Sequence, residues 1–263
     1  MEKMTGKVLS QKELCPGIFD LRLYAPAIAE AASAGQFVNV FCREASRLLP
    51  RPLSLCRAEA AAGEIRLVYR AGGDGTREFS ALSEGDALEL LGPLGNGFPL
   101  EMAAGKRVLL IGGGIGIPPM LQTAVSLSDR VENRRPSEMT AVLGYRDQTF
   151  LSDEFGQIVK TYLATEDGSA GTKGTVLDAI RENNLDADLI FACGPKMMLR
   201  ALKVYASERG IPCQVSLEER MACGIGACLA CVCETAEVNG HTHVHNARVC
   251  KDGPVFDAEM VVL

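Results

Sequence analysis

The chain has 263 residues, of which 47% are hydrophobic and 23% charged, and its formal net charge at pH 7 is -6. This composition supports packed cores and argues against disorder, and the scattered Lys and Arg residues argue against nucleic-acid binding. The N-terminus has no apolar signal segment, and the most apolar run, VLLIGGGIGIPPML, is broken by Gly and Pro before it reaches membrane-spanning length. We therefore expect a cytoplasmic protein. Half of its ten cysteines follow residue 222, which favours metal ligation over disulfides.

Residues 1–100 consist of short predicted strands separated by Gly and Pro. GIFDLRLYAP alternates Phe19, Leu21 and Leu23 with Asp20 and Arg22, and GQFVNVFC, EIRLVYR and DALELLGP follow it. Short strands at regular spacing with turn signals between them favour a closed antiparallel β barrel over a parallel sheet. We expect this barrel to be the first domain.

Residues 101–217 show strands that alternate with helices. RVLLIG is a predicted strand, PPMLQTAVSLS a helix and MTAVLGY the next strand, and the alternation continues through SDEFGQIV, KTYLATE, TVLDAIREN, ADLIFACG and KMMLRALKVYASERG. This pattern predicts a doubly wound α/β domain. Four scattered cysteines, interpreted as small core hydrophobes, lie outside the C-terminal segment: Cys15, Cys42, Cys56 and Cys213.

Residues 218–263 are too few for a core of their own, so we expect a metal site to stabilise them. Cys223, Cys228 and Cys231 are separated by four and two residues in CGIGACLAC, and Cys250 follows in NARVCKDGPVF. This is the ligand spacing of a plant-type 2Fe-2S cluster. The alternative is structural zinc, which prefers two Cys-x-x-Cys pairs where this segment has one. Cys233 does not fit the spacing and is interpreted as a bystander.

The cluster segment contains two further features. Gly224 and Gly226 allow backbone amides to approach the cluster sulfurs. All three histidines lie in HTHVHN, as His241, His243 and His245, and on a strand they would share one face, as a second metal site requires. The dipeptide at residues 239–240 (NG) instead favours an exposed hairpin arm.

Two glycine-containing turns are expected at one edge of the α/β sheet. GGGIGIPPM, from Gly112 to Met120, follows a strand and opens a helix, so its bare amides suit a pyrophosphate, although a simple tight turn fits it equally. CGPKMM, which begins at Cys193, also ends a strand and opens a helix, where open sheets bind ligands. A buried structural thiol is the alternative for Cys193.

Two stretches of the barrel suit a phosphate-containing ligand. RPLS presents the Arg51 guanidinium on a rigid extended backbone, with the Ser54 hydroxyl close by. VYRAGGDGT places Tyr69 and Arg70 before a glycine loop that reaches Gly75, and this loop could hold the same pyrophosphate. Taken alone, RPLS also fits an ordinary turn or a surface charge.

The order of these motifs resembles that of the ferredoxin reductase family of flavoenzymes: RPLS with the glycine loop, then GGGIGIPPM, then CGP. The segment SLEERMACGIGACLACVC, with Cys250 in VCKDGPVF, narrows the resemblance to the electron-transfer subunits of dihydroorotate dehydrogenase B, over essentially the whole chain. The stretch from Cys231 to Cys250 looks somewhat long for that family, which leaves the geometry of the histidine arm open.

The resemblance implies three bound groups and their contacts. A 2Fe-2S cluster would bind Cys223, Cys228, Cys231 and Cys250. FAD would occupy the barrel, with contacts from Arg51, Pro52, Leu53, Ser54, Val68, Tyr69, Arg70, Gly75 and Thr76. NAD would bind the α/β domain at Gly112, Gly113, Gly114, Gly116, Cys193, Gly194 and Pro195, with the TEDGS stretch (165–169) nearby.

The resemblance also implies a partner and a role in pyrimidine biosynthesis. In this family the chain pairs with a catalytic subunit that holds FMN and oxidises dihydroorotate to orotate, and we expect a heterotetramer of two plus two chains. The chain itself, to which no catalytic residue is assigned, would exchange hydride with NAD through its flavin and pass single electrons through the cluster. Net flow would run from dihydroorotate to NAD.

Two alternative functions remain open on the sequence. The first is the FAD and 2Fe-2S subunit of a ferredoxin:NADP reductase or sulfhydrogenase complex, for which the pyridine nucleotide is a discriminator. Arg146 could contact a 2'-phosphate, but the adjacent Asp147 would repel one, which favours NAD. The second is a regulatory nucleotide-binding protein with structural zinc, in which the barrel motifs have no role.

Overall fold

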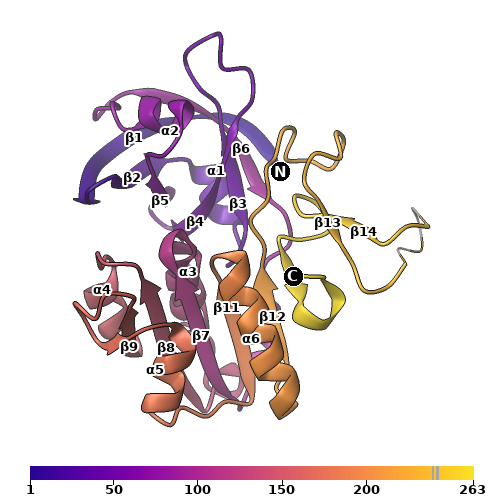
Figure 1. The fold of residues 1–263 in the computed structure, drawn as a ribbon. Helices are drawn as coiled ribbons and strands as arrows, with labels where there is room; N and C mark the ends of the chain where they lie inside the picture. Colours follow the sequence, from indigo (N-terminus) through magenta and orange to yellow (C-terminus); the bar gives the residue numbers. More distant parts are fainter. Residues whose placement is uncertain (239, 241–242) are drawn as a thin grey trace.

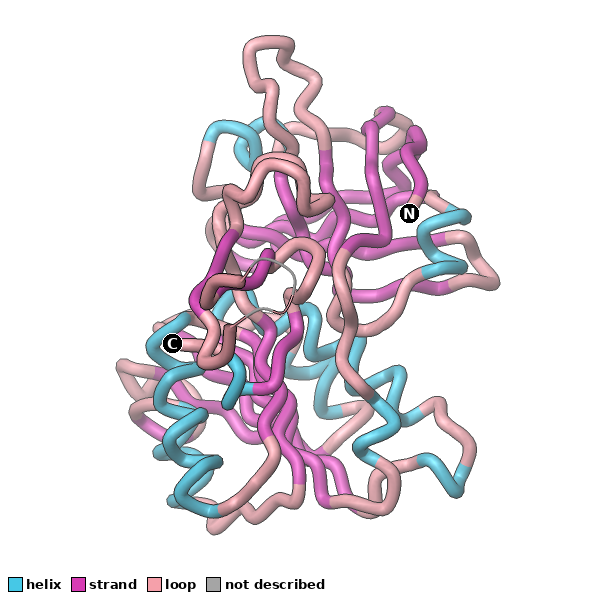
Figure 2. Tube along the Cα trace, turned by 90° about the vertical axis from the view of Figure 1, so that its right-hand side faces the viewer, coloured by secondary structure: helices cyan, strands magenta, loops and turns pink. Residues whose placement is uncertain are grey.

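A computed structural model describes residues 1–238, 240 and 243–263 of the chain. It consists of a barrel, an α/β layer and a small C-terminal module that lies against both (Figure 1). Turned by 90°, the same arrangement shows the barrel strands crossing above the sheet, whose helices cover its two sides (Figure 2). In the described part of the chain, no helix has the length and apolar character needed to cross a membrane.

The N-terminal residues form the predicted closed barrel, with strand order β1-β2-β5-β4-β3-β6 and antiparallel pairing throughout. Its strands are β1 (Glu2–Cys15), β2 (Ile18–Tyr24), β3 (Phe37–Val40), β4 (Arg51–Glu59), β5 (Glu64–Arg70) and β6 (Ala87–Leu94). Two short helices, α1 (Pro26–Ala31) and α2 (Asp74–Phe79), lie between strands. Alternating apolar residues of these strands, such as Leu21 and Leu23, fill the barrel interior.

The predicted alternation of β2 is wrong at one position. Asp20 is 3% exposed, although a polar residue in that register was expected on the surface. The reason is Arg66 on β5, whose Nη2 atom lies 2.8 Å from Asp20 Oδ2. Arg66 Nη1 also contacts Glu154 Oε2 at 2.5 Å, and Glu154 belongs to the α/β domain, so this buried arginine ties the two domains together.

The α/β domain has a seven-stranded sheet in the order β10-β9-β8-β7-β11-β12-β15. Its strands are β7 (Arg107–Gly113), β8 (Glu138–Tyr145), β9 (Lys160–Thr165), β10 (Thr172–Lys173), β11 (Leu189–Cys193), β12 (Cys213–Ser216) and β15 (Val255–Asp257). Helices α3 (Ile117–Ser128) and α4 (Ser152–Gly156) pack into one core cluster, and α5 (Val176–Glu182) and α6 (Lys196–Arg209) into another, as a doubly wound sheet requires. Short 3-10 turns occur at η1 (Leu100–Ala103), η2 (Gly114–Gly116), η3 (Glu132–Arg134) and η4 (Ala258–Met260).

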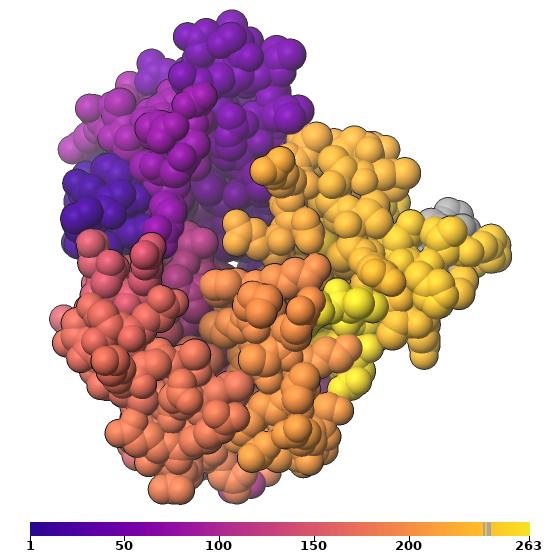
Figure 3. Space-filling view, in the orientation of Figure 1, coloured from indigo at the N-terminus to yellow at the C-terminus, as the bar shows by residue number. Residues whose placement is uncertain are grey.

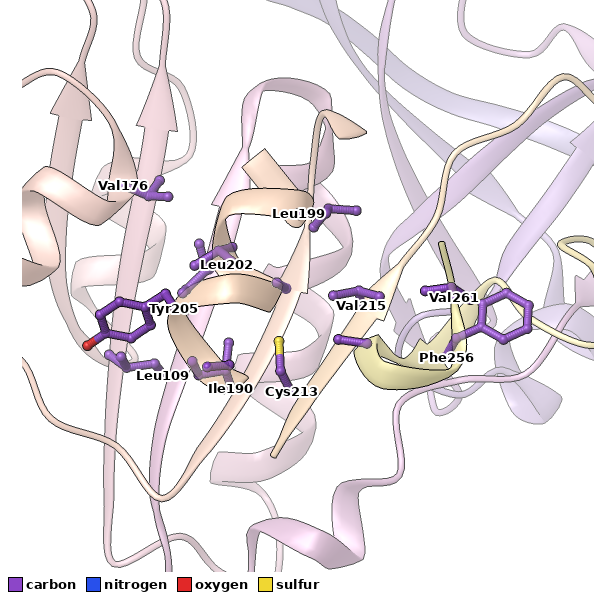
Figure 4. Packing of buried hydrophobic residues seen from close by; sticks show 14 of the residues in the cluster. Leu109, Val176, Ile190, Leu199, Leu202, Tyr205, Cys213, Val215, Phe256 and Val261 are labelled. Atoms are coloured by element: carbon purple, nitrogen blue, oxygen red, sulfur yellow. The ribbon is translucent and has the colours of Figure 1, made fainter. Parts of the chain in front are cut away.

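The C-terminal module shares the core of the α/β domain. It contains the hairpin strands β13 (Val232–Glu234) and β14 (Asn246–Arg248), and then returns to the large sheet as β15, which pairs antiparallel with β12. Phe256 and Val261 lie beside Val215 of β12 (Figure 4). The module therefore gains its apolar burial from the α/β domain, a source of stability that we did not predict beside the metal site.

The four scattered cysteines differ in burial. Cys56 and Cys213 are buried, in agreement with their interpretation as core residues. Cys15 and Cys42 are only half-buried and pack at the edges of two cores, so that interpretation does not hold for them.

Candidate functional site

The predicted cluster ligands converge on one loop and on the turn after β14. Backbone N–H groups of Ile225, Ala227 and Cys228 donate to Cys223 Sγ at 3.5, 3.3 and 3.4 Å. Gly226 N–H donates to Cys250 Sγ at 3.1 Å, and Cys250 N–H donates to Cys231 Sγ at 3.4 Å. The loop thus surrounds the sulfurs with amide donors, which stabilise thiolates and the sulfurs of an iron-sulfur cluster.

The pKa values of the first and last cysteine of the ligand set are shifted in opposite directions. Burial acts to raise the pKa of the Cys223 thiol, but the amide hydrogen bonds from Ile225 and its neighbours outweigh it and lower the pKa to about 6. Burial, reinforced by Cys231, raises the pKa of Cys250 to about 12. Cys223 is therefore ready to bind a metal as a thiolate, whereas Cys250 must lose its proton when the metal binds.

The exposure of the cluster loop is uneven. Cys231 and Cys250 are buried, while Cys228 is exposed together with Ile225 and Leu229, which are 42% and 61% exposed. Among residues 1–238, 240 and 243–263, no three ligating side chains converge as a single metal ion requires.

The barrel motifs lie on neighbouring strands. RPLS begins β4 with half-exposed side chains from Arg51 to Ser54, and the stretch from Val68 to Arg70 ends β5. Arg51 Nη1 contacts the carbonyl of Leu49 at 2.5 Å, and the described residues offer its guanidinium no carboxylate within ion-pair distance. Such a positive charge beside a glycine loop suits a phosphate.

Two of the predicted barrel contacts have buried side chains. Tyr69 is 1% exposed, donates its hydroxyl to Gln11 Oε1 at 3.0 Å and stacks on Phe19. Val68 is 4% exposed. The Tyr69 side chain belongs to the barrel core, whereas the Val68 side chain packs on the opposite face of β5 in the core cluster that contains α3 and α4.

The two glycine turns of the α/β domain pack directly on each other. Gly112 and Cys193 are partners in the parallel pairing of β7 with β11. A Cβ atom on Gly116 would overlap the carbonyl of Cys193, and one on Gly113 would lie 2.5 Å from Met198 Sδ and 3.0 Å from Pro195 Cδ. The strand order reverses between β7 and β11, which is where such sheets bind ligands beyond the carboxyl ends of their strands.

Cys193, the predicted thiol of the second turn, lies at the carboxyl end of a central strand of the sheet. Cys193 ends β11, and burial raises the pKa of its thiol to about 12 against the opposing hydrogen bond from Ser216. A neutral thiol at the carboxyl end of β11 is a small apolar group rather than a reactive nucleophile.

Two acidic loops lie at the carboxyl ends of β8 and β9. Glu166 N–H donates to the carbonyls of Tyr145 and Arg146 at 3.2 and 3.1 Å, and the Ser169 hydroxyl donates to the carbonyl of Asp147 at 3.1 Å. The structure thus joins the predicted TEDGS stretch to the Arg146–Asp147 pair, on the sheet edge that carries the glycine turns.

The histidine arm is only partly described. Residues 239 and 241, which carry the predicted turn and His241, lie outside the described residues. His243 and His245 are exposed and lie in bends rather than in a strand, and His245 Nδ1 lies 3.1 Å from the carbonyl of Thr235. His243 and His245 therefore do not share one face of a strand, as the predicted second metal site would require.

Sequence reasoning missed several residues that hold the cluster loop. Asn39 and Asn96 reach it from the barrel, with hydrogen bonds to the carbonyls of Cys223 and Lys251. Arg248 pairs with Asp252 across the turn that carries Cys250, and its Nη1 atom donates to the carbonyl of Gly226 at 3.3 Å. Of these residues, only Arg248 and Asp252 could have been found from the sequence, because they lie four residues apart on either side of Cys250.

Two segments of the chain match models of known protein families. Residues 218–262 match the family model of the iron-sulfur cluster binding domain of dihydroorotate dehydrogenase B, and residues 110–203 match that of the oxidoreductase NAD-binding domain. The chain is 44% identical over 266 residues to the dihydroorotate dehydrogenase B (NAD(+)) electron transfer subunit of Bacillus caldolyticus, covering 100% of this chain and 98% of that protein. It is 41% identical over 268 residues to the same subunit of Bacillus cereus strain B4264, with complete coverage of both chains.

Solved structures with this fold include other flavin-linked reductases. A structure of the NADH-dependent reduced ferredoxin-NADP oxidoreductase aligns with a TM-score of 0.85 and 31% identity, over 98% of this chain and 89% of that one. A ferredoxin NADP+ reductase from Neisseria gonorrhoeae aligns with a TM-score of 0.67 and 18% identity, over 80% and 92% of the two chains. The second likeness indicates a shared fold and nothing further.

Proposed function

The chain belongs to the family of electron transfer subunits of dihydroorotate dehydrogenase B, and we propose that it performs this transfer through FAD, a 2Fe-2S cluster and NAD. It is an oxidoreductase subunit of pyrimidine biosynthesis, and its membership implies a catalytic partner subunit. The proposal concerns how its own residues hold the three groups and in what order they act.

The observation that carries the proposal is the convergence of Cys223, Cys228, Cys231 and Cys250 under amide donors. A cluster with bound sulfides is negatively charged, and amides aimed at its sulfurs offset that charge. The four thiolates would hold two irons, and the loop's glycines leave the amides unobstructed. The cluster supplies one-electron transfer when it is bound.

The barrel motifs fit FAD for two reasons. The Arg51 guanidinium is in no ion pair with a described residue, and Gly75 leaves room for it beside the glycine loop, so a pyrophosphate has both a charge partner and nearby amides. Pro52, Leu53 and Ser54 continue the half-exposed edge along β4, where a flat apolar ring with polar rims can lie. FAD supplies the exchange between two-electron hydride chemistry and single electrons.

The two glycine turns fit the nicotinamide nucleotide. Gly112 to Gly116 and the turn from Cys193 to Pro195 lie against each other at the point where the strand order reverses, and a Cβ atom on Gly114 would have no atom within 4 Å, so a ligand can approach the backbone there. The molecular surface is hollowed where the barrel, the α/β domain and the C-terminal module meet (Figure 3). Nicotinamide and flavin would meet in this hollow, with the protein orienting both and excluding water.

The partner in this proposal is an FMN-containing catalytic subunit, in a complex of two copies of each chain. The exposed side of the cluster loop, with Cys228, Ile225 and Leu229, supports electron exchange with a second protein, since a buried cluster could not be approached. Electrons from dihydroorotate would pass from FMN through the cluster to FAD and leave as hydride on NAD.

The test is purification of the complex from its native cell. We expect a flavoprotein partner, dihydroorotate-dependent reduction of NAD, flavin absorbance and a rhombic EPR signal from the reduced cluster. A hydrogenase or ferredoxin-dependent reductase as the partner would contradict the proposal. So would a colourless chain that contains zinc and no iron.

A further inference from the structure

A side chain of the barrel holds the first cluster ligand. Asn39 lies on β3, is 0% exposed, and donates from Nδ2 to the carbonyl of Cys223 at 3.1 Å. In the sheet register, Asn39 is the partner of Pro52, and its neighbour Val40 is the partner of Arg51. Strand β4, which carries the proposed flavin contacts, is therefore adjacent to β3, which carries Asn39.

The contact between Asn39 and the loop is close and costly. Gly224 sits on the Asn39 amide with φ +70, and a Cβ atom there would overlap the amide nitrogen. The other end of the amide, Oδ1, is buried without a hydrogen-bond partner in the described part of the chain. A buried carbonyl without a hydrogen-bond partner is unfavourable and an apolar residue would avoid that cost, so packing alone does not account for an asparagine here.

A second asparagine of the barrel holds the other end of the ligand set. Asn96 follows β6, and its Nδ2 atom donates to the carbonyls of Lys251 and Asp252 at 3.1 and 3.0 Å. Its backbone N–H donates to the carbonyl of Gly253 at 2.7 Å. These carbonyls directly follow Cys250, so the barrel contacts the loop beside both its first and its last ligand.

We propose that Asn39 and Asn96, together the asparagine pair, are positioning residues that set the cluster's placement relative to the flavin for electron transfer between them. The inference rests on the proposed function of the same site. Apolar packing against the α/β domain keeps the C-terminal module in place, but it is not directional. Hydrogen bonds from β3 and from the end of β6 are directional, and both strands belong to the flavin barrel.

The test uses the full complex with its partner and two variants. Asn96→Ala removes an exposed side chain and leaves the fold intact, and Asn39→Leu replaces the buried amide with a similar volume. For both we expect NADH to bleach the flavin at the wild-type rate, because the nucleotide site is untouched. Reduction of the cluster, followed by freeze-quench EPR, should slow on the order of tenfold, as for other outer contacts of metal ligands.

The control and the contrary outcomes separate this inference from the proposed function. Asn183→Ala is a matched control, since Asn183 Nδ2 also donates to a backbone carbonyl, that of Ala179, but within α5 and its cap. It should change neither rate. Cluster reduction at the wild-type rate in Asn96→Ala overturns the inference, even if Asn39→Leu loses its cluster. Equal slowing of flavin reduction and of cluster reduction also overturns it. A wild-type complex without flavin or cluster would instead overturn the proposed function.

Discussion

The Arg51 side chain packs on the bare α-carbon of Gly75, where a Cβ atom would overlap the guanidinium. This contact joins the start of β4 to α2 and holds the guanidinium beside the glycine loop. The position is buried, so an added methyl group cannot move outward and must displace the arginine.

We therefore expect Gly75→Ala to weaken FAD binding by about 10-fold to 100-fold, the loss that follows when one charged hydrogen-bond partner is misplaced. Fluorescence titration of the flavin-free chain with FAD would measure it. Gly156→Ala, at an α4 position with no atom within 4 Å of its added Cβ, is the control and should bind as wild type. Equal affinity of the two variants would rule out a phosphate role for Arg51.

The ligand assignment separates Cys250 from Cys233, which are both buried. Cys250 Sγ accepts the Gly226 amide of the cluster loop, whereas Cys233 lies on β13 and does not fit the ligand spacing. Cys250→Ser should lose most of the iron and the visible absorbance of the cluster, because serine is a poorer ligand for iron than thiolate. Cys233→Ser should keep both the iron and the absorbance. If Cys233→Ser lost iron and Cys250→Ser did not, Cys233 would be the ligand in place of Cys250. Iron analysis with EPR is the measurement.

The predictable part of the site is the part whose signal is local in sequence. The spacing from Cys223 to Cys231 and the turn at Gly112 each lie within a few residues, and backbone geometry brings them to their places. Asn39 and Asn96 act on partners 184 and 155 residues away, and an asparagine in a strand or loop carries no mark of such a partner. The barrel and the alternating α/β pattern follow from periodicity.

The burial of Asp20 and the return of β15 to the sheet were not predictable for a related reason. Both depend on a partner from another part of the chain. Asp20 is predicted as a surface residue until the neighbouring strand β5 brings the Arg66 guanidinium to it, and β15 has only three residues, too few to show a period of their own.

The two carboxylates that contact Arg66, those of Asp20 and Glu154, should contribute unequally to the free energy of unfolding. Removing Asp20, which is 3% exposed, leaves the buried Arg66 without one of its two counter-charges, and Asp20→Ala should destabilise the chain by about 3–5 kcal/mol. The Glu154 side chain is 44% exposed, so Glu154→Gln should cost about 1 kcal/mol or less. Urea unfolding of the two variants tests the order, and a larger loss in Glu154→Gln would contradict it.

The contact between Arg66 and Glu154 gives a pH dependence with a defined sign. The hydrogen bond from Arg66 holds the pKa of Glu154 below its ordinary value of 4.5. The group's contribution is therefore complete above pH 4.5 and is lost as the pH falls through the lowered pKa. Wild type and Glu154→Gln should converge in stability as the pH drops below about 4, and parallel curves down to lower pH would contradict the assignment.

The choice of pyridine nucleotide should depend on Asp147 at the carboxyl end of β8. Its backbone carbonyl accepts the Ser169 hydroxyl at 3.1 Å, which holds the two acidic loops together at the sheet edge beside the glycine turns. An exposed carboxylate near a 2'-phosphate repels it by about 1 kcal/mol in water, whereas Arg146 alone would attract it. Asp147→Ser should therefore raise kcat/KM for NADPH about fivefold and change that for NADH little.

The control for this substitution is Asp129→Asn, which removes the same charge at the C-terminal end of α3. Since α3 begins at the glycine turn and spans 12 residues, Asp129 lies near the opposite edge of the sheet. Any gain for NADPH that came only from the lower net charge would appear in both variants. A gain confined to Asp147→Ser places the adenosine ribose at the ends of β8 and β9, and equal gains would remove Asp147 from the nucleotide site.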